Sequence, residues 1–411
     1  MATAGTSPQA PAFPPFESFE TEEARAIENL QTYYEQWVAA TRLLDTTLKG
    51  SLRWKAVGAK QYLYHRVSSN PLVDLSLGPR NADTHARMLE FKHEQAASRA
   101  RQQAALAESL KFAQILRSMK LGNVDKQAAA LLRHFDRKAM LGDLLLVVGT
   151  NAMLAYEVEA GGRIFRGYDA TQDFDLTWRG QPALQLQANV HGNAQAGAQA
   201  EIRPPVSLIG TLREVDRLYT VNSERTFQAT TGKYEVEFLA APSTIQTFPF
   251  AKGDVAPMGN IAEQEWLMLG RPLRHVVAAS DGTPAPICAP DPRWMALHKL
   301  WLSQKPQRRA TKKPKDEAQG LLLLRAVVEA MASYPVDLEF IAQVEETLRP
   351  FLHMGLKWVR ENPSHPRGDG MLRGVDEAVW RKLRRTPAAP VVHARGLAAG
   401  VPDKKPVRMR Y

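Results

Sequence analysis

Two hydrophobic periods divide the first part of the chain into a helix and a hairpin. Over residues 20–48 apolar side chains recur every three or four positions, which predicts an amphipathic helix. Large apolar residues then alternate with polar ones over 51–55 and 61–66, and Gly58 between these runs predicts a β-hairpin. Residues 74–80 have the composition of a loop and lie between basic neighbours.

Two further helices are expected before the middle of the chain. Asp83 and Thr84 are suited to cap a long helix that runs to about Leu121. Apolar residues are sparse in the middle of this helix, so we expect part of it to form an exposed arm. Residues 125–141 predict an amphipathic helix that leads directly into the next strand.

The most informative stretch begins with a short apolar run, residues 144–148, which predicts a buried strand. Gly149, Thr150 and Asn151 then turn the chain into residues 152–159, which are typical of a short helix. A strand, a turn of small residues and a helix N-terminus together present free backbone N–H groups. The stretch therefore predicts a phosphate-binding turn.

Acidic residues alternate with apolar ones on two later strands. The period of two places Asp173 and Asp175 on one face of the first strand. Residues 233–239 form the second alternating strand and carry Glu235 and Glu237 on one face. Because carboxylate oxygens are the ligands that hard divalent cations prefer, these positions are candidates for a metal site.

The C-terminal third is predicted to be helical. Residues 284–292 contain four prolines, which we interpret as the boundary between a mixed α/β core and a helical part. Residues 305–313 form a basic linker between the first two helices, and from Glu361 onward the chain is rich in Pro, Gly and Arg. The helices are expected at 294–303, 315–333 and 337–354.

Composition narrows the function classes. The 411 residues carry a formal net charge of +10, which favours polyanionic partners such as nucleotides or nucleic acid. Cys288 is the single cysteine, so neither a disulfide framework nor a cysteine-rich zinc site is available. The N-terminus lacks the pattern of a signal peptide and no apolar run has transmembrane length, so we expect a cytoplasmic protein. The G-x-S-x-G, Walker A and H-E-x-x-H patterns are absent from the sequence.

Three segments carry a family resemblance. They are Val147 to Ala152, Thr171 to Asp175, and Asp291 to Ser303, which reads D-P-R-W-M-A-L-H-K-L-W-L-S. The chain resembles the DNA-polymerase-β-like nucleotidyltransferases, and more narrowly a bacterial family of nucleotidyltransferase-fold proteins, over roughly residues 50–366. It departs from the wider superfamily at Thr150, where Ser or Gly is usual, and in a longer gap between Gly149 and Asp173.

The resemblance implies an α+β fold with a polymerase-β-like mixed sheet flanked by helices, an N-terminal helical and hairpin region, and a C-terminal helical domain. The expected parts are a disordered N-terminus (1–18), an N-terminal helical region with a β-hairpin (19–140), a nucleotidyltransferase core (141–290), a C-terminal helical domain (291–362) and a basic tail (363–411).

The resemblance also implies a site for two Mg²⁺ or Mn²⁺ ions held by three strand carboxylates. Asp173, Asp175 and Glu237 are the expected catalytic and metal-binding residues, although Asp is commoner than Glu at the third position. Glu235 shares the strand face of Glu237 and is the substitute. The expected nucleotide-binding residues are Gly149, Thr150, Asn151, Lys299 and Lys315.

Lys299 lies in an otherwise apolar helix between His298 and Leu300. A lysine in such a helix usually extends to water, but here it could reach the outer phosphates of a nucleotide. In that case we expect Lys299→Ala to leave thermal stability nearly unchanged. Lys315 is followed by Asp316, which would orient a basic partner or favour the helix N-terminus. His298 is interpreted as structural, because no second histidine stands at metal-ligand spacing.

Two functions from different classes fit these observations. The first is a Mg²⁺-dependent transfer of NMP from an NTP to a hydroxyl of an RNA 3′ end, a protein or a small molecule. The basic charge favours RNA as the acceptor, although no recognised RNA-binding motif is present. The second is a catalytically inactive binding or regulatory module, as part of a toxin–antitoxin or phage-defence system.

Overall fold

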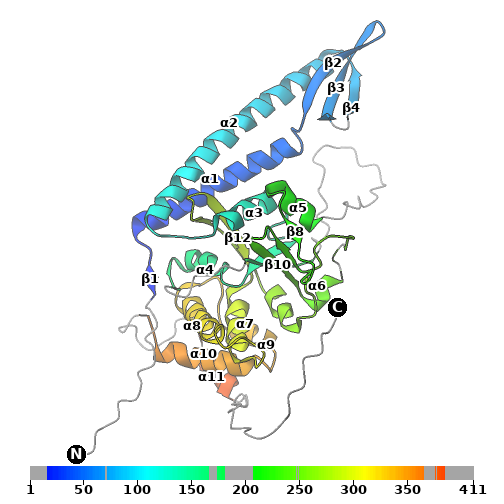
Figure 1. Cartoon of the computed structure of the whole chain (residues 1–411). Coiled ribbons are helices and arrows are strands. Elements are labelled where there is room, and N and C mark those ends of the chain that lie inside the picture. The colour runs from blue at the N-terminus through cyan, green and yellow to red at the C-terminus, as the bar shows by residue number, and fades with distance from the viewer. Residues whose placement is uncertain are drawn as a thin grey trace, which may run out of the picture.

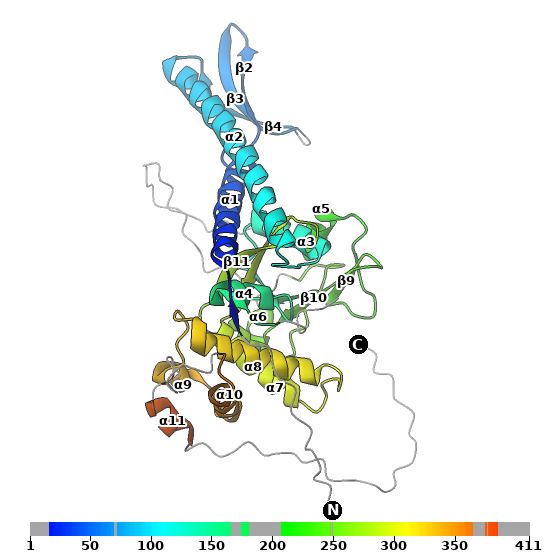
Figure 2. The ribbon, with the colours of Figure 1, turned by 90° about the vertical axis from the view of Figure 1, so that its left-hand side faces the viewer.

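The computed structural model describes residues 16–69, 72–165, 174–180, 207–246, 248, 250–364, 375 and 377–384. Three layers follow one another: a projecting arm, a mixed sheet with its helices, and a group of C-terminal helices on the far side of the sheet (Figures 1 and 2). Helices and mixed sheets of this kind confirm the expected α+β class.

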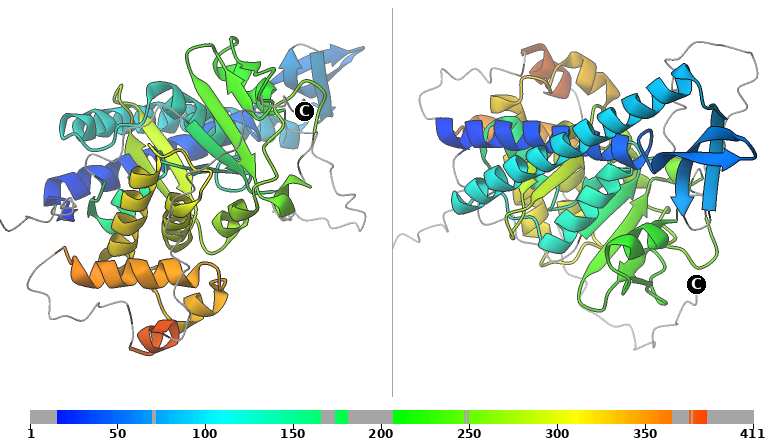
Figure 3. Two further views of the ribbon diagram at one scale, coloured as in Figure 1. Left: turned by 60° about the horizontal axis from the view of Figure 1, so that its bottom comes forward. Right: turned by 90° about the horizontal axis from the view of Figure 1, so that it is seen from above.

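The arm consists of helices α1 (Thr21–Asp45) and α2 (Ala82–Ser118), which cross each other at an angle when seen from above (Figure 3). A three-stranded antiparallel sheet forms its tip, with β2 (Ser51–Val57), β3 (Lys60–Ser69) and β4 (Leu72–Pro79) in that order. The predicted hairpin is therefore confirmed.

Two expectations about the arm were wrong. The segment predicted as a loop at 74–80 pairs with β3 as strand β4, because the hairpin leaves the outer edge of β3 open for pairing. The cap of α2 is Asn81 rather than Asp83 or Thr84, since the Asn81 side chain accepts a hydrogen bond from the Thr84 N–H at 2.8 Å.

A buried carboxylate joins the arm to the rest of the molecule. Asp136 of α3 (Lys126–Arg137) is fully buried and accepts a hydrogen bond from the Tyr34 hydroxyl of α1 at 2.8 Å. Arg274 of β11 (Leu273–Ala278) binds both Asp136 oxygens, at 3.0 and 2.9 Å. Burial lowers the pKa of the Arg274 guanidinium, but the hydrogen bonds and charge of Asp136 outweigh burial and raise that pKa above its ordinary value.

The central sheet has the strand order β5-β7-β10-β9-β8. Strand β7 is antiparallel to β5 and parallel to β10, while β9 and β8 continue the sheet in antiparallel fashion. Helices α3, α4 and α5 contribute to the same hydrophobic core as these strands. The bounds are β5 Leu145–Val148, α4 Met153–Ala160, β7 Phe174–Trp178, α5 Leu208–Val215, β8 Thr220–Val221, β9 Gln228–Thr230 and β10 Glu235–Ala240.

The proline-rich segment expected as a boundary is instead strand β12 (Pro284–Ala289), which pairs with β11 and is buried throughout. Pro284 and Pro286 are two residues apart, so their nitrogens both lie on the edge that does not face β11, where no N–H is needed. The sheet and the C-terminal helices therefore share one core.

Helices α7 (Pro292–Gln304) and α8 (Lys313–Ala330) follow as expected. The single helix predicted at 337–354 was wrong: it is two helices, α9 (Leu338–Gln343) and α10 (Arg349–Glu361), separated by an extended Val344. Short elements complete the description: β6 (Gly162–Arg163), α6 (Pro242–Ile245) and a 3₁₀ helix, η1 (Ala262–Met268).

Both expected terminal parts contain structure. Strand β1 (Glu17–Ser18) pairs with β6, inside the segment expected to be disordered. Helix α11 (Glu377–Arg384), inside the expected tail, places Val379 and Leu383 in the core, because its apolar residues recur on one face. The end of the basic tail lies outside the described residues. Among the described helices, none combines the length and the apolar character that crossing a membrane requires.

Candidate functional site

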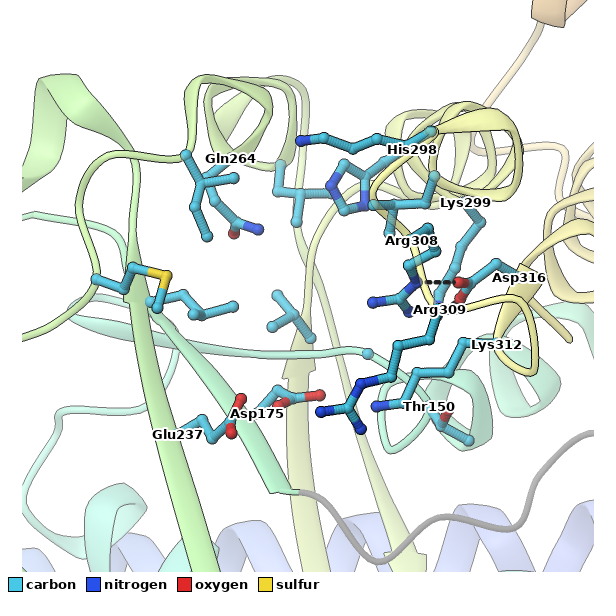
Figure 4. A pocket seen from close by; sticks show the side chains of 18 of the residues that line it. Thr150, Asp175, Glu237, Gln264, His298, Lys299, Arg308, Arg309, Lys312 and Asp316 are labelled. Atoms are coloured by element: carbon cyan, nitrogen blue, oxygen red, sulfur yellow. Dashed lines mark hydrogen bonds and ion pairs between the residues drawn. The ribbon is translucent and has the colours of Figure 1, made fainter. Parts of the chain in front are cut away.

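A cavity of about 1150 Å³ lies between the central sheet and the C-terminal helices (Figure 4). It takes its lining from the end of β5, from β7 and β10, from η1, from α7, and from the linker between α7 and α8. Segments far apart in sequence thus meet at one place, and the cavity contains most of the residues that the sequence singled out.

Two acids occupy one wall of the cavity. The parallel ladder between β7 and β10 sets Asp175 directly beside Glu237, so both carboxylates lie on the same face of the sheet. Phe174 and Val236, one position earlier on each strand, point to the other face and are fully buried in the core. The alternation read from the sequence therefore places these two acids correctly. Asp173 lies outside the described residues.

Glu235 is the more exposed acid of its strand, although it also lines the cavity. Gln228 on β9 donates a hydrogen bond from its amide to Glu235 at 2.7 Å and a longer one to Glu237 at 3.4 Å. Within the described residues, Glu237 is the acid of β10 that pairs directly with Asp175. This register favours Glu237 over Glu235 as the partner of Asp175.

The turn after β5 approaches the acids closely. Gly149 has a φ of 72°, and a Cβ atom added there would lie 2.5 Å from Oδ2 of Asp175. Glycine is therefore required for two reasons, the left-handed backbone and the proximity of a carboxylate. Thr150 also lines the cavity, and its hydroxyl accepts a 3.4 Å hydrogen bond from the Gln319 amide of α8. Asn151 belongs to the same turn but not to the cavity lining.

The opposite wall is cationic. Lys299 comes from α7, Lys315 from α8, and the linker between these helices adds further basic side chains. Figure 4 shows Arg309 and Lys312 extending from the linker toward the side of the cavity where Asp175 and Thr150 lie. The linker was recognised from the sequence as basic, but Arg309 and Lys312 were not among the expected nucleotide-binding residues. The basic lining residues are Arg225, Lys299, Lys305, Arg308, Arg309, Lys312 and Lys315.

Lys299 does not extend to water, because it is only 4% exposed and its Nζ lies 3.0 Å from Oδ1 of Asp316. Arg308 binds the other oxygen of Asp316 at 2.7 Å. Burial lowers the pKa of the Lys299 ammonium. Burial also raises the pKa of the Asp316 carboxyl, but Lys299 and Arg308 outweigh burial and hold that pKa below its ordinary value. Asp316 thus orients two cations at the cavity wall.

The third side of the cavity is largely apolar. It includes Ile261 and Leu267 of the η1 region, and Trp301 of α7. His298 also lines this side of the cavity. From the sequence it was expected to have only a structural role, so its position at the cavity was not anticipated. Burial, followed by the nearby charge of Lys299, lowers the pKa of the His298 imidazole to about 3, so this side chain is uncharged at neutral pH.

The cavity therefore offers carboxylates on one wall, cations across from them and an apolar third side. Oxygen ligands suit a hard divalent cation, and the facing cations suit phosphate groups. Within the described residues, no cluster of three His, Cys, Asp or Glu residues is arranged to hold a metal ion. The described part of the acidic wall consists of Asp175 and Glu237 with Glu235 beside them.

We expect Gly149→Ala to destabilise the fold more than Gly161→Ala does. Both glycines have a left-handed backbone, with φ of 72° and 69°, so both variants bear a similar conformational cost. Only at position 149 does the new methyl group meet a carboxylate, because nothing lies within 4 Å of a Cβ at position 161. Urea unfolding should show an additional loss of about 1–2 kcal/mol for Gly149→Ala. Equal losses in the two variants would contradict the close approach of Asp175.

We also expect Lys299→Met to lower the free energy of unfolding by about 1–3 kcal/mol. The burial of Lys299 thus replaces the earlier expectation that removing this lysine leaves stability nearly unchanged. The variant leaves the buried Asp316 with Arg308 as its remaining cation in the described ion-pair network. Lys313→Met is the matched control, because Lys313 is half-buried at the start of α8 and lies outside the cavity lining. Chemical denaturation should show a change within about 0.5 kcal/mol for the control.

Comparison with known proteins bears on this arrangement. The model of a family described as nucleotidyltransferase matches residues 126–343, more than half of the chain. The matched residues do not include the arm, and they cover less of the chain than residues 50–366, over which the resemblance extends. A search of curated proteins and a search of solved structures found no match. The chain belongs to the nucleotidyltransferase family.

Proposed function

We propose that this protein transfers a nucleoside monophosphate from an NTP to a hydroxyl acceptor, with the help of Mg²⁺ or Mn²⁺. The observation that carries the proposal is the pairing of Asp175 with Glu237 directly across the cavity from a wall of cations. A nucleoside triphosphate with a bound metal ion has the complementary charges, because the metal ion matches the acids and the phosphates match the cations. The acceptor oxygen would attack the α-phosphorus, the bond to the β-phosphate would break, and pyrophosphate would leave.

The acids are suited to bind a divalent cation, because they supply oxygen ligands and are accessible from the cavity. Asp175 and Glu237 both present oxygen ligands from adjacent strands, and both lie on the cavity surface. We propose that Asp173, two residues before Asp175, joins them. A bound metal ion would lower the pKa of the attacking hydroxyl and screen the phosphate charge.

The cations would bind the phosphates. Arg309 and Lys312 extend toward the acidic side, where the reacting phosphate would lie. Lys299 and Arg308 are held by Asp316, so their positive charges need not reorganise as pyrophosphate leaves. Lys315 also lines this wall. Thr150 and the turn at Gly149 complete the phosphate-binding side.

The arm tip favours RNA as the acceptor. Residues 49–80 contain six Lys or Arg residues and one acid, Asp74, so they supply a formal charge of +5, half of the net charge of the chain. Tyr62 and Tyr64 share one face of the tip sheet with Lys55 and Arg53, because these residues are directly opposite each other in the ladder. Unpaired bases stack on aromatic rings while lysine and arginine bind the phosphates.

We expect Asp175→Asn and Glu237→Gln each to reduce nucleotidyl transfer by at least about 100-fold, because neither amide replaces a charged metal ligand. Labelled NTPs, Mg²⁺ and total RNA would be used to measure the transfer. Glu235→Gln is the matched control on the same strand face, and it should retain most of the activity. If the wild type binds NTP but transfers no nucleotide to hydroxyls of RNA, protein or small molecules, the inactive binding module would be favoured instead.

We expect the double variant Tyr62→Ala and Tyr64→Ala to bind single-stranded RNA at least about tenfold more weakly, since each stacked base contributes about 1–3 kcal/mol. Fluorescence anisotropy of a labelled oligoribonucleotide would measure this. Leu89→Ala is the control, because Leu89 is an exposed apolar residue of α2 near the tip. RNA binding that is equal in wild type and double variant would show that the tip does not bind the acceptor.

A further inference from the structure

The 3₁₀ helix η1 places a polar side chain in the apolar side of the cavity. Gln264 is only 4% exposed, yet it belongs to the cavity lining. Its side-chain amide points from η1 into the cavity (Figure 4). The Oε1 atom of this amide is buried and has no hydrogen-bond partner among the described residues.

A buried amide oxygen without a donor is costly. Leaving such an acceptor unsatisfied costs about 1–3 kcal/mol, which is why buried polar atoms nearly always have partners. A hydrophobic residue of similar size would fill this position without that cost. The position therefore makes sense if a donor reaches Gln264 when the cavity is occupied.

The residues around Gln264 limit the kind of ligand that can supply this hydrogen-bond donor. The neighbouring lining is apolar and aromatic, with Ile261 and Leu267 from the η1 region and Trp301 from α7. The His298 ring lies 6.4 Å from the Trp301 ring and nearly parallel to it, at 25°. Flat apolar surfaces beside one amide suit a planar ring with polar edges better than they suit a sugar or a phosphate.

The location also separates Gln264 from the acidic wall. In Figure 4 the Gln264 side chain and the His298 ring lie at one end of the cavity, and Asp175 and Glu237 lie at the other. His298 is uncharged at neutral pH. Lys305, the cation at this end, is paired with Glu263 of η1 at 3.0 Å and lies over the Trp301 ring. An elongated ligand with phosphate at one end and a planar ring at the other would occupy both ends.

We propose that this end of the cavity is a nucleobase subsite, in which the Gln264 carbonyl accepts a hydrogen bond from an amino or ring N–H group of the base. The Gln264 amide can donate to a neighbouring base acceptor, so the side chain reads a donor and acceptor pair and selects among bases. The inference rests on the proposed nucleotidyl transfer, because it deepens the assignment of the same cavity. It makes Gln264 a specificity-determining residue.

The test is equilibrium binding to the full chain of the four NTPs, the four nucleosides and inorganic tripolyphosphate, which lacks a base. The wild type should bind at least one NTP about tenfold or more tightly than tripolyphosphate, and should discriminate among bases. Gln264→Leu should remove this discrimination and lower NTP affinity about tenfold, with tripolyphosphate binding unchanged. Gln304→Leu is the control and should leave base discrimination unchanged, since Gln304 is an exposed amide of α7 outside the cavity lining.

The stability of Gln264→Leu distinguishes base recognition from a merely structural role of Gln264. Because the Gln264 oxygen has no partner among the described residues, Gln264→Leu should unfold at the same or a higher urea concentration than the wild type. A clear loss of stability with unchanged base discrimination would overturn the subsite.

The remaining outcomes distinguish the two proposals. Equal wild-type binding of four NTPs and tripolyphosphate would overturn the base subsite and leave nucleotidyl transfer standing. Binding of nucleosides without binding of any triphosphate would support the subsite and overturn the proposed transfer. Absence of binding by all of these probes would overturn both.

Discussion

The site depends on the parallel pairing of β7 with β10. This ladder sets Asp175 opposite Glu237 and, in the same register, buries Phe174 and Val236 on the other face. A slip of either strand by one residue would move its acid into the core and its apolar residue into the cavity, so the hydrophobic core itself enforces the position of the carboxylates. The turn at Gly149 follows from this constraint, because a side chain there would displace Asp175.

The cationic wall depends on a second constraint, the desolvation of charge. Lys299 is almost completely buried, and an ammonium group in that position is tolerated because Asp316 lies 3.0 Å away. Arg308 shares the same carboxylate, so one acid fixes two cations from two different segments. This arrangement gives up stability that an apolar trio would provide, and in return it holds positive charge in place at the cavity surface.

The sequence predicted what depends on local periodicity and did not predict what depends on distant partners. Alternation was enough to assign the strands of Asp175 and Glu237 and the faces on which these acids lie, because the side-chain period of a strand is fixed. It could not show that Lys299 is buried, since that outcome requires Asp316, which lies on the next helix. The strand at 72–79 was missed for the same reason: its pairing partner, β3, supplies the order that its own composition does not indicate. Gln264 gave no signal, because a glutamine in a short polar and apolar segment is ordinary until its burial is known.

Two successive residues of α7 show how one helix can serve both ends of the cavity. His298 and Lys299 are both buried, so burial lowers the pKa of each. Their environments then diverge, because Lys299 has Asp316 within hydrogen-bonding distance, whereas His298 packs beside the rings of Trp266 and Trp301. An imidazole in that position is neutral at physiological pH and presents a flat surface, while the neighbouring ammonium contributes to the cationic wall. The polarity of the cavity therefore changes within one peptide unit, and that change marks the boundary between the apolar end, where we place a base, and the charged end, where we place phosphate.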